Sequence, residues 1–238
     1  MSRIINYIAQ HPFRSLAISY VLVVTATYSL TRDTARPKGP EASIVKVLNL
    51  AGTGGGTGWV TKAKGKNVIV TNDHVCAVEM GGYVIIQTDD GRLGRKKVLK
   101  RSAVRDLCIV EGLRAPALRI APFGPRRFDK LTVYGHPLLK PTTPSTGEYL
   151  EDGVVPIGMG PNEEGNCQEG TEEIESFFGK ICVLPMELSY STVPIYPGNS
   201  GSPVLNEEGE VVGVMNSSDS RDNRGMFIPL QYLKEILE

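Results

Sequence analysis

Short runs of β-branched residues, separated by turn residues, recur from Ile44 onward and restrict the fold more than any other feature of the chain. Such runs are typical of β-strands, and Asp90-Gly91 and the segment 206–209 are turn signals between them. Many short strands with frequent turns predict an all-β sandwich or barrel, and only the final segment 230–237 is predicted to be a helix. The predicted strands include residues 44–48, 59–61, 67–71, 83–88, 131–134, 181–184, 202–205 and 210–215.

The N-terminal segment is distinct from the rest. Residues 15–30 contain no charged side chain and lie between Arg14 and Arg32. As a helix they would span about 24 Å, less than the roughly 30 Å of a bilayer core. We interpret residues 1–31 as an uncleaved membrane anchor or a cleaved signal segment, with the anchor preferred because the cleavage site at 24–26 is weak. Basic residues on both sides leave the orientation open. Residues 32–43 are predicted to be a linker.

Three segments supply the residue types of a serine-hydrolase triad. Ser200 lies in a glycine-rich turn, His74 follows an apolar run, and Asp106 precedes another. A serine hydroxyl needs an activating base, which a histidine oriented by a carboxylate provides. The order His, Asp, Ser differs from that of α/β-hydrolases, in which the histidine follows the serine, and no histidine follows Ser200 here. Asp73 and Asp89 are rival acids, and we interpret His136 as structural.

These segments resemble the signature motifs of trypsin-like serine peptidases, most closely those of the HtrA/DegP-like branch. The similarity covers roughly residues 44–238 and rests on Thr71-Asn72-Asp73-His74-Val75, Asp106-Leu107-Cys108-Ile109-Val110 and Pro197-Gly198-Asn199-Ser200-Gly201-Ser202-Pro203. The resemblance implies two six-stranded antiparallel β-barrels and a C-terminal helix over residues 44–238, with the active site between the barrels. It implies that His74, Asp106 and Ser200 are catalytic, and that no cofactor or metal is needed.

The resemblance also places the oxyanion hole and the substrate pocket. The oxyanion hole is expected at the backbone of Gly198, Asn199 and Ser200. Ile195, Met215 and Asn216 are expected to bind substrate, and because no acid lies at the pocket base, we expect an apolar P1 residue. The expected partners are polypeptides, and a homo-oligomer is compatible with the family. Membrane attachment or a cell-envelope or periplasmic location, with a role in protein quality control or processing, would suit this branch, although viral polyprotein processing fits the motifs equally.

Two departures keep other functions open. Ser202 stands where the family usually has glycine, and no PDZ domain is expected after residue 238. A catalytically inactive binding module on the same scaffold is the principal alternative, and an esterase is a weaker one. A formal net charge of zero gives no reason to expect nucleic acid as a partner.

The four cysteines do not identify the redox compartment. Cys76 and Cys108 are interpreted as buried thiols, although the triad would bring them near each other. Cys167 and Cys182 could close an acidic loop, and the sequence does not decide whether they do. The cysteine spacing fits no zinc motif.

Overall fold

The computed structural model describes residues 39–49, 51–76, 82–159, 167, 171–176, 179–218 and 224–238. The predicted hydrophobic helix within residues 1–31 lies outside these residues, as does most of the predicted linker. The linker's last residues form a short 3-10 helix, η1 (Pro40–Ser43), which leads into the first strand. Among the described residues, no helix combines the length and the apolar composition that a membrane crossing needs.

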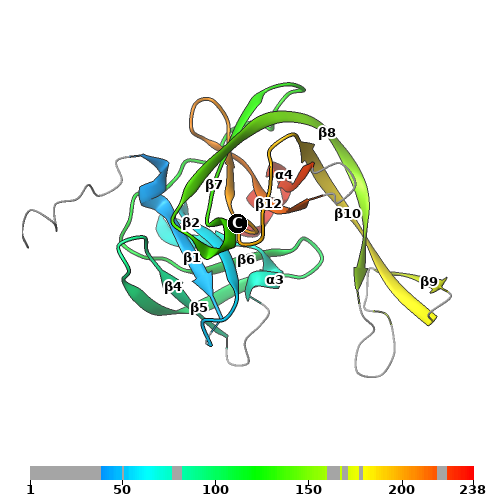
Figure 1. Ribbon diagram of the computed structural model, residues 1–238, viewed down its shortest axis with the longest axis horizontal. Helices are drawn as coiled ribbons and strands as arrows, with labels where there is room; N and C mark the ends of the chain where they lie inside the picture. Colours follow the sequence, from blue (N-terminus) through cyan, green and yellow to red (C-terminus); the bar gives the residue numbers. More distant parts are fainter. Residues whose placement is uncertain are drawn as a thin grey trace, which may run out of the picture. The chain divides into compact units, whose positions relative to one another are not determined.

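Six strands of the described chain close into an antiparallel barrel in the order β1-β2-β3-β6-β5-β4 (Figure 1). Alternate residues of each strand face the barrel interior, as the pleat of a β-strand requires. Val45 and Val47 of the first strand are buried there, while Lys46 between them is only half-buried. The strands are β1 (Ile44–Leu48), β2 (Gly55–Ala63), β3 (Lys66–Thr71), β4 (Tyr83–Gln87), β5 (Leu93–Ser102) and β6 (Leu107–Glu111).

The other strands of the described chain form a seven-stranded antiparallel sheet in the order β13-β12-β11-β7-β8-β10-β9. Residues 189–191 of β10 also pair with residues 225–227 of β13, and this pairing joins the sheet into a second ring with β9 attached outside it. Its strands are β7 (Lys130–Gly135), β8 (Thr143–Met159), β9 (Glu172–Ser176), β10 (Gly179–Ser191), β11 (Pro203–Leu205), β12 (Val211–Ser218) and β13 (Gly225–Pro229).

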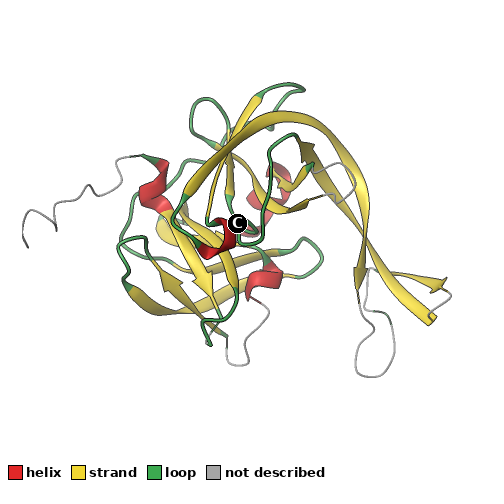
Figure 2. Cartoon of the chain, viewed as in Figure 1, coloured by secondary structure: helices red, strands yellow, loops and turns green. Residues whose placement is uncertain are grey.

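The predicted all-β class is confirmed, and Figure 2 shows strands throughout with only short helices. The predicted C-terminal helix is α4 (Leu230–Leu237), which buries Leu230, Tyr232, Leu233 and Ile236. Strand β9 was not predicted from the sequence. It pairs with the part of β10 that extends away from the ring, beside the equally extended β8 (Figure 1).

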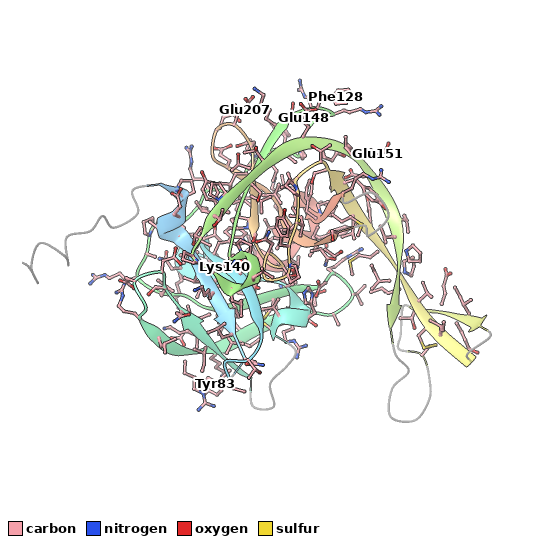
Figure 3. The ribbon with its side chains drawn as sticks, viewed as in Figure 1. Tyr83, Phe128, Lys140, Glu148, Glu151 and Glu207 are labelled. Carbon is pink, nitrogen blue, oxygen red and sulfur yellow. A yellow bond between two sulfur atoms is a disulfide. The ribbon has the colours of Figure 1, made fainter. Side chains whose placement is uncertain are left out.

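Strand β8 shows how the second sheet separates core from surface. Tyr149 is buried and packs edge-on against Phe227, with 6.2 Å between the ring centroids. Glu148 next to it and Glu151 are exposed, and their side chains lie on the outer side of the strand in Figure 3. Tyr149 belongs to the larger core cluster, and Val155 and Ile157 pack against it, whereas Val154 next to Val155 is exposed.

The cysteines form two disulfides in the described residues. Cys76 pairs with Cys108, and Cys167 pairs with Cys182. The interpretation of Cys76 and Cys108 as free buried thiols is therefore wrong. The segments after His74 and Asp106 converge, and this convergence brings the Cα atoms of the first pair within 6.5 Å.

Candidate active site

His74 lies on the short helix α3 (Asp73–Cys76), which begins just after β3 ends and packs beside β6 (Figure 1). Two polar contacts hold this segment. The guanidinium of Arg101 pairs with the buried carboxylate of Asp73, with Nε 2.6 Å from Oδ1 and Nη2 3.0 Å from Oδ2. The side-chain amide of Asn72 donates to the backbone carbonyl of Asp106 at 3.0 Å. The start of α3 is thus fixed against both β5 and the segment that carries the acid.

Asp106 binds His74 twice. Its Oδ2 lies 2.7 Å from Nδ1 of the imidazole, and its Oδ1 accepts the backbone N–H of His74 at 2.8 Å. An ionised carboxylate can only accept, so Nδ1 carries a proton and Nε2 is left as the acceptor of the ring. Neither rival acid is hydrogen-bonded to the imidazole of His74, because Asp73 pairs with Arg101 and Asp89 lies against His136.

The surroundings of His74 change its pKa in opposing ways. Burial lowers the pKa, while the hydrogen bond and the charge of Asp106, with the charge of Asp73, raise it. The net result is a pKa above the ordinary value, because both carboxylates favour the imidazolium. An imidazole with a raised pKa accepts a proton readily, and the carboxylate of Asp106 stabilises the positive charge that results.

Ser200 lies in the turn between β10 and β11, where Gly198 and Gly201 have φ angles of +95° and +85°. Only glycine adopts such angles without strain. The carbonyl of Ser200 accepts the N–H of Thr57 from β2 at 2.8 Å, which fixes the turn against the first barrel. The Ser200 hydroxyl donates to the backbone carbonyl of Asn216 at 3.0 Å, and not to the imidazole of His74.

His74 and Ser200 nevertheless border the same space. A cavity of about 290 Å³ has both side chains in its wall. Its lining consists of Asn49, Gly54, Gly55, His74, Val75 and Ser200. The structure thus brings the three residues predicted as catalytic to one place, although they come from three distant segments.

The predicted oxyanion residues differ in what their amides do. The N–H groups of Gly198 and Ser200 have no hydrogen-bond acceptor among the described residues. The N–H of Asn199 donates to the carbonyl of Tyr196 at 3.0 Å, so it closes the turn. Two unpaired donors beside the nucleophile can receive a developing negative charge on a substrate carbonyl.

The three predicted pocket residues are all buried. Met215 is fully buried in the larger core cluster, and Ile195 belongs to the same cluster. Asn216 directs its side-chain amide to Oδ2 of Asp106 at 2.5 Å. Sequence reasoning selected Asn216 as a contact for substrate and missed its contact with the acid. No spacing signal reveals that contact, because the two residues are 110 positions apart.

Known proteins resemble the chain in both sequence and fold. The trypsin-like peptidase domain matches residues 56–214. The serine protease Do-like HtrA of Bacillus subtilis is 26% identical over 78% of the chain, and the putative serine protease HhoA of Synechocystis is 30% identical over 77%. The chain spans only 39% and 42% of these two relatives. The active form of the Rv3671c protease of M. tuberculosis has a TM-score of 0.65 at 20% identity, with 83% of this chain and 80% of that one covered.

Proposed function

The chain belongs to the trypsin-like peptidase family, and on this premise we propose that it is a serine endopeptidase that works through His74, Asp106 and Ser200. One observation carries the proposal. Nδ1 of His74 lies 2.7 Å from Asp106, and the same imidazole lines one cavity with Ser200. A base, its orienting acid and a hydroxyl therefore meet at a space that a peptide bond could enter.

In the proposed reaction, the Ser200 hydroxyl turns from the carbonyl of Asn216 toward Nε2 of His74 and gives up its proton as it attacks the scissile carbonyl. The carboxylate of Asp106 stabilises the imidazolium, which then protonates the leaving amine. Water then attacks the acyl-enzyme while His74 takes its proton, and His74 returns this proton to the Ser200 oxygen as the ester bond breaks and the new carboxyl group leaves. The free N–H groups of Gly198 and Ser200 hold the oxyanion in both halves of the reaction.

The preferred substrates are polypeptides with an apolar P1 residue, because the segments expected to wall the pocket, 193–196 and 215–217, contain no acidic side chain that would select Arg or Lys.

We also propose a location and an assembly. The chain would act at the cell envelope in protein quality control or processing, with residues 1–31 as its anchor or signal segment, and it would form a homo-oligomer. Membrane fractionation of the full chain, with and without residues 1–31, tests the location, and sedimentation of the full chain tests the assembly.

A fluorophosphonate probe with a peptide library tests the chemistry. We expect labelling of the wild type and of Ser145→Ala, a control in β8, and no labelling of Ser200→Ala. Peptide bonds after apolar residues should be cleaved best. Absence of labelling in the wild type would favour the inactive binding module, faster turnover of esters than of peptides would favour an esterase, and cleavage mainly after Arg or Lys would overturn the P1 assignment.

A further inference from the structure

A second histidine–carboxylate pair lies behind the proposed oxyanion hole. We infer that Asp89 and His136 are positioning residues that hold the turn carrying Gly198 in its active conformation. The inference rests on the proposed function, because it concerns how the oxyanion hole of that site is held. Neither residue lines the cavity that His74 and Ser200 share.

The pair joins the two rings of strands. His136 follows β7 and is fully buried, and its Nε2 lies 2.9 Å from Oδ1 of Asp89 and 3.0 Å from the hydroxyl of Thr142. Asp89 belongs to the turn between β4 and β5 of the first barrel. Burial raises the pKa of Asp89, but the opposing effect of the hydrogen bonds from Thr142 and His136 is larger. The pKa therefore lies below its ordinary value, and the carboxylate stays ionised at neutral pH.

The backbone after His136 connects this pair to the turn of the nucleophile. His136 is followed by the short helix η2 (Pro137–Leu139), whose position is marked in Figure 3 by the labelled Lys140 that follows it. The N–H of Leu138 donates to the carbonyl of Pro197 at 2.6 Å. A trans peptide is planar, with its C=O and N–H pointing in opposite directions. Holding the Pro197 carbonyl on η2 therefore directs the N–H of Gly198 away from η2, and this N–H has no acceptor among the described residues.

Thr57 of β2 makes a second connection. Its hydroxyl accepts the backbone N–H of His136 at 2.9 Å and donates to the carbonyl of Gly198 at 2.8 Å. Of the two carbonyls that flank the Gly198 amide, that of Pro197 is therefore bonded to the segment that starts at His136, and that of Gly198 to a hydroxyl that also binds the His136 backbone. The two backbones also touch, since a Cβ at Gly198 would lie 2.3 Å from the carbonyl oxygen of His136.

The conformation of η2 needs such support. Leu138 and Leu139 have φ angles of 54° and 56°, in the left-handed region that side chains larger than glycine disfavour. Leu138 is also mostly exposed, so packing of its side chain does not explain this conformation. The part-buried contact of His136 with Asp89 at the start of the segment, and the bonds to Pro197 and Gly198, hold it in place.

The first test replaces Asp89 by Asn, which keeps the shape but removes the charge. We expect kcat on a peptide substrate to fall about tenfold or more with little change in KM, because a misdirected oxyanion donor weakens only the transition state. A peptide aldehyde, which forms the tetrahedral oxyanion, should bind weaker by a similar factor. The same peptide with a reduced scissile bond has no carbonyl and should bind equally well. Asp90→Asn, in the same turn but bonded to Thr88 and Arg92 instead of His136, is the matched control and should behave as the wild type.

Variants of Thr57 provide a second test, which remains informative if Asp89→Asn fails to fold. Thr57→Val should lose kcat and aldehyde affinity, and Thr57→Ser, which keeps the hydroxyl, should restore both. Wild-type kcat in both Asp89→Asn and Thr57→Val would overturn the inference, as would an equal loss of affinity for the aldehyde and the reduced peptide. A wild type that neither cleaves peptides nor binds the aldehyde would instead overturn the proposed function.

Discussion

The side-chain amide of Asn216 donates to Oδ2 of Asp106 at 2.5 Å, and the backbone carbonyl of the same asparagine accepts the hydroxyl of Ser200 at 3.0 Å. One residue of β12 therefore contacts both the acid and the nucleophile of the proposed triad. Asp106 receives this donor in addition to the ring and the backbone N–H of His74. The amide of Asn216 and the ring of His74 both bind Oδ2, so Asn216 affects how strongly Asp106 interacts with the imidazole.

Asn216→Ala removes the amide donor and keeps the backbone carbonyl. We expect kcat to fall about tenfold or more, since a hydrogen bond to a charged group contributes roughly 1.5–3 kcal/mol. Asp106 would then interact more strongly with His74, so the acidic limb of kcat/KM should move to higher pH. A pH–rate profile measures both effects. Ser145→Ala, in β8 and outside the site, is the control, and an unchanged profile in Asn216→Ala would show that the contact has no role.

The wild-type pH profile should reflect the raised pKa of His74. Since the base must be neutral to accept the proton of Ser200, kcat/KM should rise with a midpoint above 6.5, the ordinary value for histidine. A raised pKa in the folded state also stabilises the fold fully below the unfolded pKa, and this contribution is lost as pH rises through the folded pKa. Urea unfolding of the wild type and His74→Gln should therefore show a smaller difference at pH 8.5 than at pH 5.5. A difference that grows with pH would contradict the assigned direction.

Gly198→Ala should abolish activity. The added Cβ would lie 2.3 Å from the carbonyl oxygen of His136, at a φ of +95°, so the turn must move. Loss of an oxyanion donor costs about 10²–10³ in kcat where it has been measured. Gly209→Ala has a comparable φ of +72° but meets nothing within 4 Å, so it should lose only about 1 kcal/mol of stability and keep its activity. Steady-state kinetics and thermal unfolding of both variants separate the local clash from general backbone strain.

Arg101→Ala should destabilise the fold and reduce activity together. It leaves the carboxylate of Asp73, which is 8% exposed, without its ion-pair partner at the start of α3. Because Arg101 itself is 45% exposed, we expect a loss of roughly 1–2 kcal/mol in the free energy of unfolding, with a smaller kcat because α3 carries His74. Arg92→Ala breaks an exposed pair with Asp90 and should cost roughly 0.5 kcal/mol or less. Equal effects in the two variants would argue against an anchoring role for Arg101.

The two disulfides should differ in their effect on catalysis. Replacing Cys76 and Cys108 together by Ala should lower the free energy of unfolding by about 2–4 kcal/mol, since the bridge closes a loop of 32 residues. It should also reduce kcat, because each cysteine lies two positions after a proposed catalytic residue. The corresponding change at Cys167, between β8 and β9, and Cys182, on the extension of β10, should leave kcat unchanged. A loss of kcat in the second variant alone would show that the extension, and not the bridge beside the triad, supports the site.

Much of the fold and the site was predictable because its signals are local. The alternation of buried and more exposed side chains along strands such as β1 follows from the pleat. Turn residues such as Gly91 indicate hairpins from only a few neighbouring positions. The segments around His74, Asp106 and Ser200 could be recognised one at a time, and their order in the chain indicated how they would be used. Strand β9 could not be predicted in this way, because its three glutamates give it no apolar alternation.

The remaining contacts depend on where two closed rings of strands bring distant segments. Asn216 meets Asp106 across 110 positions and His136 meets Asp89 across 47, and a hydrogen bond forms only when the atoms come within about 3 Å. The spacing of residues in the sequence does not determine distances to within a few ångströms. The same local motifs would therefore have been compatible with other hydrogen-bond partners for Asn216 and His136. Local chemistry thus specified the candidate catalytic groups, and the packing of the two rings selected the residues that hold them.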